Sequence, residues 1–194
     1  MNGWVLAGTG VTGYLIGSLS PATIIARRQG MDLAGMGSGN PGATNAGRVL
    51  GRRVGVLVAL LDVAKGAVPA ACFGLVNHEA GLLAGFAAVL GHVTSPYLRG
   101  RGGRGVATTA GSVLGSQPWL ALVVLAVWVA VVTVTRRVAP ASVLGAVALP
   151  VAAALLGARG WTLAWAVGLA LVVVLRHWPN LRTWVSEQLT GRRR

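Results

Sequence analysis

The feature that most constrains this chain is a succession of long apolar stretches separated by short polar segments. A helix that crosses the hydrocarbon core of a membrane needs about 20 mainly apolar residues. The stretches lack the period-two alternation of transmembrane strands. The pattern therefore predicts an all-α, polytopic membrane helix bundle of about seven transmembrane helices, forming a single domain over residues 1–194. The expected spans are 3–25, 54–76, 80–98, 105–116, 118–135, 138–157 and 160–176.

The stretch 105–116 is short for a full crossing, so it could be tilted, re-entrant or joined to the next stretch by a break around Gln117 and Pro118.

Charged residues are sparse and unevenly placed. They make up 11% of the chain, against about 25% in a typical soluble domain. Of the 17 basic residues, 15 fall in alternate breaks between the apolar stretches, as expected when short cytoplasmic loops collect Lys and Arg. This alternation predicts an N-terminus outside and a C-terminus in the cytoplasm. It also accounts for the net charge of +13 without a nucleic-acid partner, which would favour a basic stripe with interleaved aromatic residues.

The shortage of acidic and sulfur ligands excludes several kinds of site. Four acidic residues and one cysteine, Cys72, occur in the chain. A two-metal or paired-carboxylate site and a multi-cysteine metal site are therefore not expected, and we predict no metal and no cofactor. Cys72 lies in an apolar stretch, so we expect a buried thiol. What remains is chemistry that depends on anion binding and positioning.

The first polar loop has the composition of a phosphate site. Its glycines leave backbone N–H groups accessible, its small polar side chains add donors, and its arginine offers a planar cation that grips phosphate oxygens. The alternative is a flexible connector, although connectors rarely place such donors at close intervals. The residues are Gly37, Ser38, Gly39, Asn40, Gly42, Thr44, Asn45 and Arg48.

A second glycine-rich loop precedes residue 106. Gly100, Gly102 and Gly105 match the spacing of a dinucleotide-binding loop, but no strand precedes them and no acidic residue follows about 20 positions later. Three arginines separated by glycines at a helix start could instead bind an oxyanion. The alternative is that they only anchor a cytoplasmic loop. They are Arg99, Arg101 and Arg104.

Two further groups of polar residues adjoin or lie inside apolar stretches. Asp62 and Lys65 are spaced to pair on one helix face, either as a structural pair or as support for the site. His177 and Asn180 follow the last apolar stretch. They could contact a phosphorylated substrate, or they could belong to an interfacial segment with Trp178 and Arg182.

Four segments resemble the motifs of the bacterial acyl-phosphate:glycerol-3-phosphate acyltransferases. GSGNPGATNAGRVLG at 37–51 is similar to the family's first motif, and Asp62-Val-Ala-Lys65-Gly66 to its D-x-x-K-G. GH at 91–92 with GRGGRGVAT at 100–108 resembles the second motif, and His177-x-x-Asn180 the third. The resemblance covers most of the chain, with the segments in order.

The resemblance implies a bacterial inner-membrane enzyme with its active site on the cytoplasmic side. Such an enzyme transfers a fatty acyl group from acyl phosphate to the 1-hydroxyl of glycerol 3-phosphate, giving lysophosphatidic acid for phospholipid synthesis. Neither coenzyme A nor a metal is needed. We expect the two phosphorylated substrates and membrane lipid as partners, and a monomer.

The resemblance also implies roles for individual residues. Ser38, Arg48 and Arg104 would hold phosphate, and His177 and Asn180 would contact glycerol 3-phosphate. Asp62 and Lys65 would support the site. The remaining substrate-binding residues would be Gly37, Gly39, Asn40, Gly42, Thr44, Asn45, His92, Gly102, Gly103, Gly105 and Thr108.

The chain departs from the family pattern at Arg104, which stands where the family has lysine, and Arg and Lys are not interchangeable at a tight phosphate site. This departure motivates one alternative, a divergent relative that acylates another phosphorylated alcohol. A second alternative, from a different class, is a small transporter of phosphorylated solutes.

Overall fold

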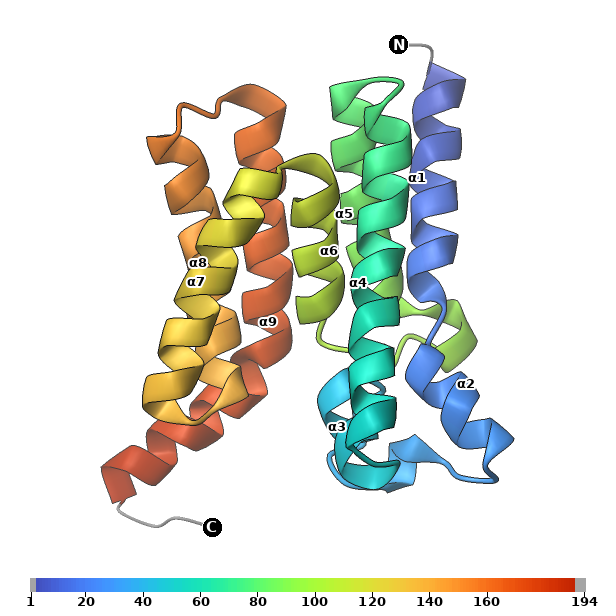
Figure 1. The fold of residues 1–194 in the computed structure, drawn as a ribbon, viewed down its shortest axis with the longest axis vertical. Coiled ribbons are helices and arrows are strands. Elements are labelled where there is room, and N and C mark those ends of the chain that lie inside the picture. Colours follow the sequence, from blue (N-terminus) through green and yellow to red (C-terminus); the bar gives the residue numbers. More distant parts are fainter. Residues whose placement is uncertain (1–2, 191–194) are drawn as a thin grey trace. The chain divides into compact units, whose positions relative to one another are not determined.

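The computed structural model describes residues 3–190, apart from the side chains of residues 180, 181 and 183–190. Throughout this part the regular elements are helices, as the apolar stretches predict (Figure 1). In chain order they are α1 (Gly3–Ser18), α2 (Pro21–Arg28), η1 (Leu33–Gly35), α3 (Ala43–Val49), α4 (Arg52–Gly74), α5 (His78–Thr94), η2 (Pro96–Leu98), α6 (Val106–Ser116), α7 (Pro118–Thr135), α8 (Val138–Leu155) and α9 (Gly160–Thr190).

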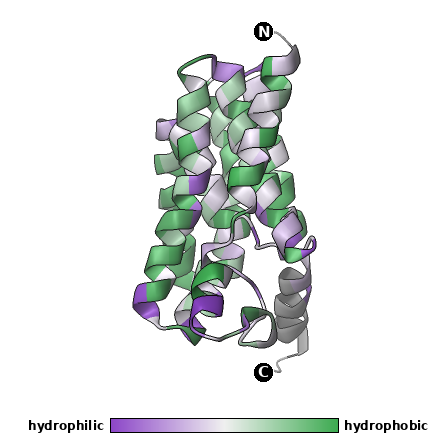
Figure 2. Cartoon of the chain, turned by 90° about the vertical axis from the view of Figure 1, so that its right-hand side faces the viewer, coloured by the Kyte–Doolittle hydropathy of each residue, from purple (hydrophilic) through white to green (hydrophobic). Residues whose placement is uncertain are grey.

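Five segments of the described chain are long and apolar enough to cross a membrane. Hydrophobic residues cover the long helices, and hydrophilic residues gather toward their ends (Figure 2). This confirms an all-helical membrane protein. Two of the seven expected spans are not among these five segments: α1 has 16 residues and α6 has 11, fewer than the roughly 20 of a full crossing. The five segments are Arg52–Gly74, His78–Leu98, Pro118–Thr135, Val138–Leu155 and Gly160–Pro179.

The chain forms two compact units, Met1–Ala121 and Leu122–Arg194, each described by itself. In the first unit, α4 packs against α5 and α6, and α1 packs against α5. Small residues bring these backbones together, since a Cβ atom on Gly66 of α4 would overlap the carbonyl oxygen of Thr108 in α6. In the second unit, α8 packs against α9, and Trp128 Nε1 of α7 donates to Ser142 Oγ of α8 at 3.4 Å.

The expected first span, 3–25, is wrong as a single helix, because the chain breaks at Leu19 and Ser20. Pro21 lacks an N–H group and opens α2, where the side chain of Ser20 caps the new helix by accepting from Thr23 N at 3.3 Å. The break leaves carbonyl groups at the end of α1 without helical partners.

Side chains from other parts of the chain donate hydrogen bonds to two of these carbonyl groups. Ser95 Oγ donates to Ser18 O at 2.7 Å, and Lys65 Nζ donates to Leu19 O at 2.6 Å. The residues after α5 and the middle of α4 therefore hold the end of α1.

A small apolar core fixes the elements around the first loop onto α4. Its buried members come from α2, η1, α3 and the first half of α4, and the loop residues 36–42 lie between η1 and α3. The first loop is thus held at both ends by packed helices. The buried members are Ala22, Ala26, Leu33, Ala46 and Val58.

Candidate active site

Asn45 organises the first loop. Its side chain is buried, its Oδ1 accepts from Ser38 N at 2.8 Å, and its Nδ2 donates to Met36 O at 3.0 Å. The oxygen and the nitrogen of the amide therefore both form hydrogen bonds to the backbone on either side of Gly37. The sequence singles out Asn45 as a substrate contact, whereas the structure uses it to shape the loop.

The glycines of the first loop allow its backbone to turn tightly around the Asn45 side chain. Gly37 and Gly39 have φ of +60° and +68°, a region that other residues rarely adopt. A Cβ atom on Gly37 would also overlap Asn45 Oδ1. Substitution at Gly37 would therefore displace the amide that holds Ser38.

The polar side chains of this segment divide between two faces of α3. Thr44 and Arg48 are one helical turn apart and exposed, whereas Asn45 and Ala46 face inward. Ser38 is also exposed, and its backbone is fixed by Asn45. The structure thus presents Ser38, Thr44 and Arg48 outward from a rigid support, as binding of a dissolved anion requires.

The second glycine loop packs closely against the end of α5. Gly102 N donates to Val93 O at 3.2 Å, and Gly103 N donates to His92 O at 3.0 Å. Both glycines are buried, and a Cβ atom on Gly102 would overlap the carbonyl oxygens of His92 and Val93. Both glycines therefore allow the loop to lie close to α5, and their N–H groups point toward that helix.

The residues that follow begin α6. Gly105 is its N-cap, with φ of +83°, and Thr108 lies fully buried in the first turn. Arg104 is half-buried and immediately precedes the cap. The start of an 11-residue helix next to an arginine is suited to an anion, because the first N–H groups of a helix have no helical partners.

Asp62 and Lys65 form a buried ion pair on α4. Asp62 Oδ1 lies 2.9 Å from Lys65 Nζ and 3.6 Å from His92 Nδ1. Pairing on one helix face, as their spacing predicts, is confirmed. The sequence does not single out Ser95 or the carbonyl of Leu19, which belong to the same buried region; the Ser-Pro pairs at 20–21 and 95–96 were the available signals.

The third predicted group lies in the second unit, on α9. His177 is buried, and its Nδ1 lies 2.8 Å from Val173 O. A carbonyl only accepts, so Nδ1 carries the hydrogen, and in the neutral ring the lone pair lies on Nε2. Asn180 also lies on α9, but its side chain is outside the described part.

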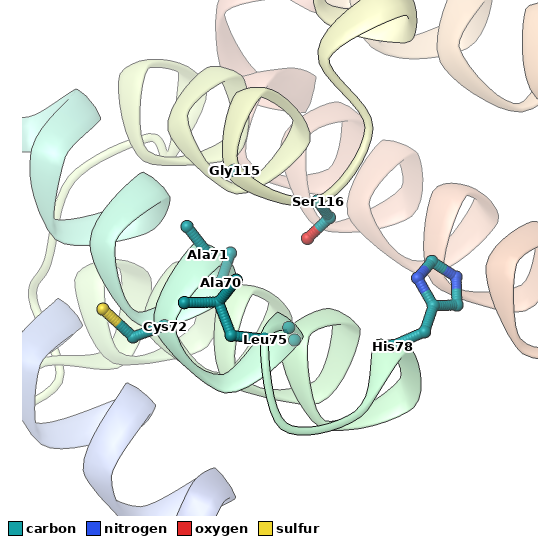
Figure 3. Close-up of a pocket in the computed structure, with 9 residues that line it drawn as sticks. Ala70, Ala71, Cys72, Leu75, His78, Gly115 and Ser116 are labelled. Carbon is teal, nitrogen blue, oxygen red and sulfur yellow. The ribbon is translucent and has the colours of Figure 1, made fainter.

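A pocket of about 350 Å³ lies between the last turns of α4 and α6 and the first turn of α5 (Figure 3). It includes Cys72, His78 and Ser116 and none of the predicted site residues. The expectation of a buried thiol is wrong, since Cys72 is exposed. Cys72 is about 200° around the helix from buried Ala70, which places it on the opposite face of α4.

The first unit contains three of the four motif segments. The first loop, the second glycine loop and the Asp62–Lys65 pair all belong to it, and the two loops lie in its lower half in Figure 1. Within the described residues, no group of three His, Cys, Asp or Glu could hold a metal ion.

Comparison with known proteins gives consistent matches along the chain. The family model for glycerol-3-phosphate acyltransferase matches residues 7–187. A glycerol-3-phosphate acyltransferase from Geotalea daltonii is 39% identical over 174 residues, covering 87% of this chain and 88% of that protein. One from Coxiella burnetii is 39% identical over 175 residues, covering 89% of this chain and 90% of the relative.

Two solved structures share the fold. Both are crystal structures of PlsY (YgiH), an integral membrane glycerol 3-phosphate acyltransferase. The glycerol 3-phosphate form has a TM-score of 0.88 at 33% identity, and the lysophosphatidic acid form a TM-score of 0.86 at 32% identity. Each match covers 97% of this chain and 94% of the other. The chain therefore belongs to the glycerol-3-phosphate acyltransferase family.

Proposed function

We propose that the chain transfers a fatty acyl group from an acyl phosphate to the 1-hydroxyl of glycerol 3-phosphate. The products are lysophosphatidic acid and inorganic phosphate. The observation that carries the acceptor and product is the match, over 97% of the chain, to acyltransferase structures in a glycerol 3-phosphate form and a lysophosphatidic acid form. The donor is supported by the second glycine loop, which places Arg104 at a helix start.

In the proposed reaction the two substrates react directly with each other, and the protein positions them. An acyl phosphate is an activated mixed anhydride: the hydroxyl oxygen attacks the acyl carbon, the hydroxyl loses its proton, and phosphate leaves. The protein has to align the two molecules and stabilise the negative charge that develops. Ser38, Arg48 and Arg104 would bind phosphate oxygens, supported by exposure of Ser38 and Arg48 on a rigid segment.

We assign His177 and Asn180 to glycerol 3-phosphate. His177 is held in a defined orientation by its bond to Val173 O, which supports a directional contact to a hydroxyl or phosphate. The other substrate contacts expected from the motifs stay part of the proposal, except that Asn45 shapes the first loop and that Gly102 and Gly103 bring the second loop close to His92 and α5.

We infer seven crossings, with α1 and α6 as the two short members of the bundle. The alternation of basic segments supports an N-terminus outside and both polar loops in the cytoplasm, at a bacterial inner membrane. Water-soluble glycerol 3-phosphate would then reach the first loop directly. We further propose that residues 1–194 act as one domain and one monomer, without a cofactor or metal.

The test is acyl transfer by the purified protein in detergent, with palmitoyl phosphate as donor and glycerol 3-phosphate as acceptor. Palmitoyl-CoA is the donor control, and glycerol, which lacks the phosphate, is the acceptor control. Lysophosphatidic acid made from palmitoyl phosphate alone is the expected result. Product from palmitoyl-CoA would overturn the donor, and equal acylation of glycerol would overturn the phosphate-binding roles.

If the folded protein forms no product but accumulates glycerol 3-phosphate in proteoliposomes, the transporter interpretation replaces the acyltransferase. Acylation of a different phosphorylated alcohol in preference to glycerol 3-phosphate would instead favour the interpretation as a divergent relative.

A further inference from the structure

A buried polar network connects α4 to the second glycine loop through His92. On its far side, Lys65 Nζ contacts both Asp62 Oδ1, at 2.9 Å, and Leu19 O, at 2.6 Å. On its near side, Asp62 Oδ1 lies 3.6 Å from His92 Nδ1, which is longer than a strong hydrogen bond. The imidazole is therefore located by the ion pair on one edge and by its packing on the other.

The opposite edge of the imidazole limits the position of the glycine loop. A Cβ atom on Gly103 would overlap His92 Nε2 and come within 2.8 Å of Cε1. The backbone of His92 also takes part, because its carbonyl accepts from Gly103 N at 3.0 Å. Ring and carbonyl together define how close the loop lies to α5.

We propose that His92 is a positioning residue, which places the Gly102–Gly103 turn so that Arg104 and the start of α6 meet the phosphate of the acyl donor. The proposal rests on the proposed function. It assigns His92 an indirect role, because Asp62 lies beside one ring nitrogen and Gly103 beside the other, whereas direct substrate contact was expected from the sequence.

The geometry gives a specific test, because the same contact can be disturbed from either side. His92→Ala removes the ring that supports the turn, and Gly103→Ala adds a methyl group where the ring lies. Gly103 has no positive φ, so alanine is otherwise compatible with its backbone. In the double variant the new methyl group occupies space that the ring has left.

The measurement is the KM for palmitoyl phosphate and kcat, in purified protein whose thermal unfolding is also recorded. Each single variant should raise the donor KM by about fivefold or more, because the misplaced Arg104 and helix start would bind the donor phosphate less tightly. A lower kcat is also expected, since a misplacement of about 1 Å can cost on the order of 100-fold in rate. The double variant should lose clearly less than the product of the two single losses, as coupled residues do. His78→Ala, an exposed histidine on the same helix, is the matched control and should keep the wild-type KM.

His92→Asn serves as a second variant if His92→Ala does not fold. It keeps a polar side chain beside Asp62 but loses the ring edge against Gly103, so the same rise in donor KM is expected. An unchanged donor KM in the folded His92 variants, with only a smaller active fraction, would overturn the positioning role. So would losses that multiply in the double variant. Absence of product from the wild type would overturn the proposed function, and the positioning role with it.

Discussion

At the scale of single residues, exposure divides the polar residues of the first loop, α3 and α4 into those that can contact substrate and those that support them. Ser38, Thr44 and Arg48 are exposed, while Asn45 and the Asp62–Lys65 pair are buried and bonded to the protein. The sequence predicts this set but cannot divide it, because an asparagine that binds substrate and one that shapes a loop look alike in a glycine-rich motif. The division depends on which face of a seven-residue helix is covered.

Arg48→Ala should reduce kcat/KM by about 100-fold or more, the range seen when one donor to a developing anion is removed. Because Arg48 is exposed, the unfolding temperature should stay near that of the wild type. Arg53→Ala, an exposed arginine in the first turn of α4, is the matched control. Equal activity of the two variants would remove Arg48 from the phosphate site.

Asp62→Asn should destabilise the protein strongly, by about 3–5 kcal/mol, because it leaves the buried ammonium group of Lys65 without its counter-ion. Unfolding in detergent, followed by circular dichroism, measures the loss. Glu79→Gln makes the same chemical change at an exposed position and should stay within about 0.5 kcal/mol of the wild type. A recovery of stability in Asp62→Asn combined with Lys65→Met would identify the unpaired charge as the cause, whereas no recovery would argue against it.

At the scale of helices, α4 and the helix that follows the second glycine loop, α6, lie in close backbone contact at Gly66 and Thr108. The apolar stretches predict most helices well, because hydrophobic length is a local property of the sequence. They do not predict the break at Leu19 and Ser20, since apolar residues continue on both sides of it. The break depends on Pro21 and on the side chains of Lys65 and Ser95, which come from distant parts of the chain.

Gly66→Ala tests the contact between α4 and α6. A methyl group there would overlap the Thr108 carbonyl oxygen, so we expect a loss of about 1–3 kcal/mol in unfolding free energy and a lower kcat/KM. Gly8→Ala on α1 has open space around its Cβ position and should be neutral or slightly stabilising. If both variants unfold at the same temperature, the close contact does not determine the packing.

At the scale of the whole molecule, charge is concentrated where substrates would arrive. Exposed arginines of α2, α3, the start of α4 and the second glycine loop belong to one unit. Among residues 27–104 the exposed acidic residues are Asp32 and Glu79. Both proposed substrates are anions, so this charge should attract them over a distance set by salt. The arginines are Arg27, Arg28, Arg48, Arg52, Arg53, Arg99 and Arg101.

Raising the salt concentration from about 0.05 to about 0.5 M should therefore lower kcat/KM for glycerol 3-phosphate by about threefold or more, with a smaller effect on kcat. An uncharged osmolyte at equal osmolarity should leave kcat/KM unchanged. A value of kcat/KM that is the same at both salt concentrations would show that the arginines do not steer the substrate.

The bond from Lys65 to the carbonyl of Leu19 spans 46 positions of the chain and has a consequence for biogenesis. During synthesis α1 leaves the ribosome well before α4. Until α4 has been made, the Leu19 carbonyl lacks this donor. The hydrogen bonding at the end of the first helix is therefore completed only when α4, made later, brings its ammonium group to that carbonyl.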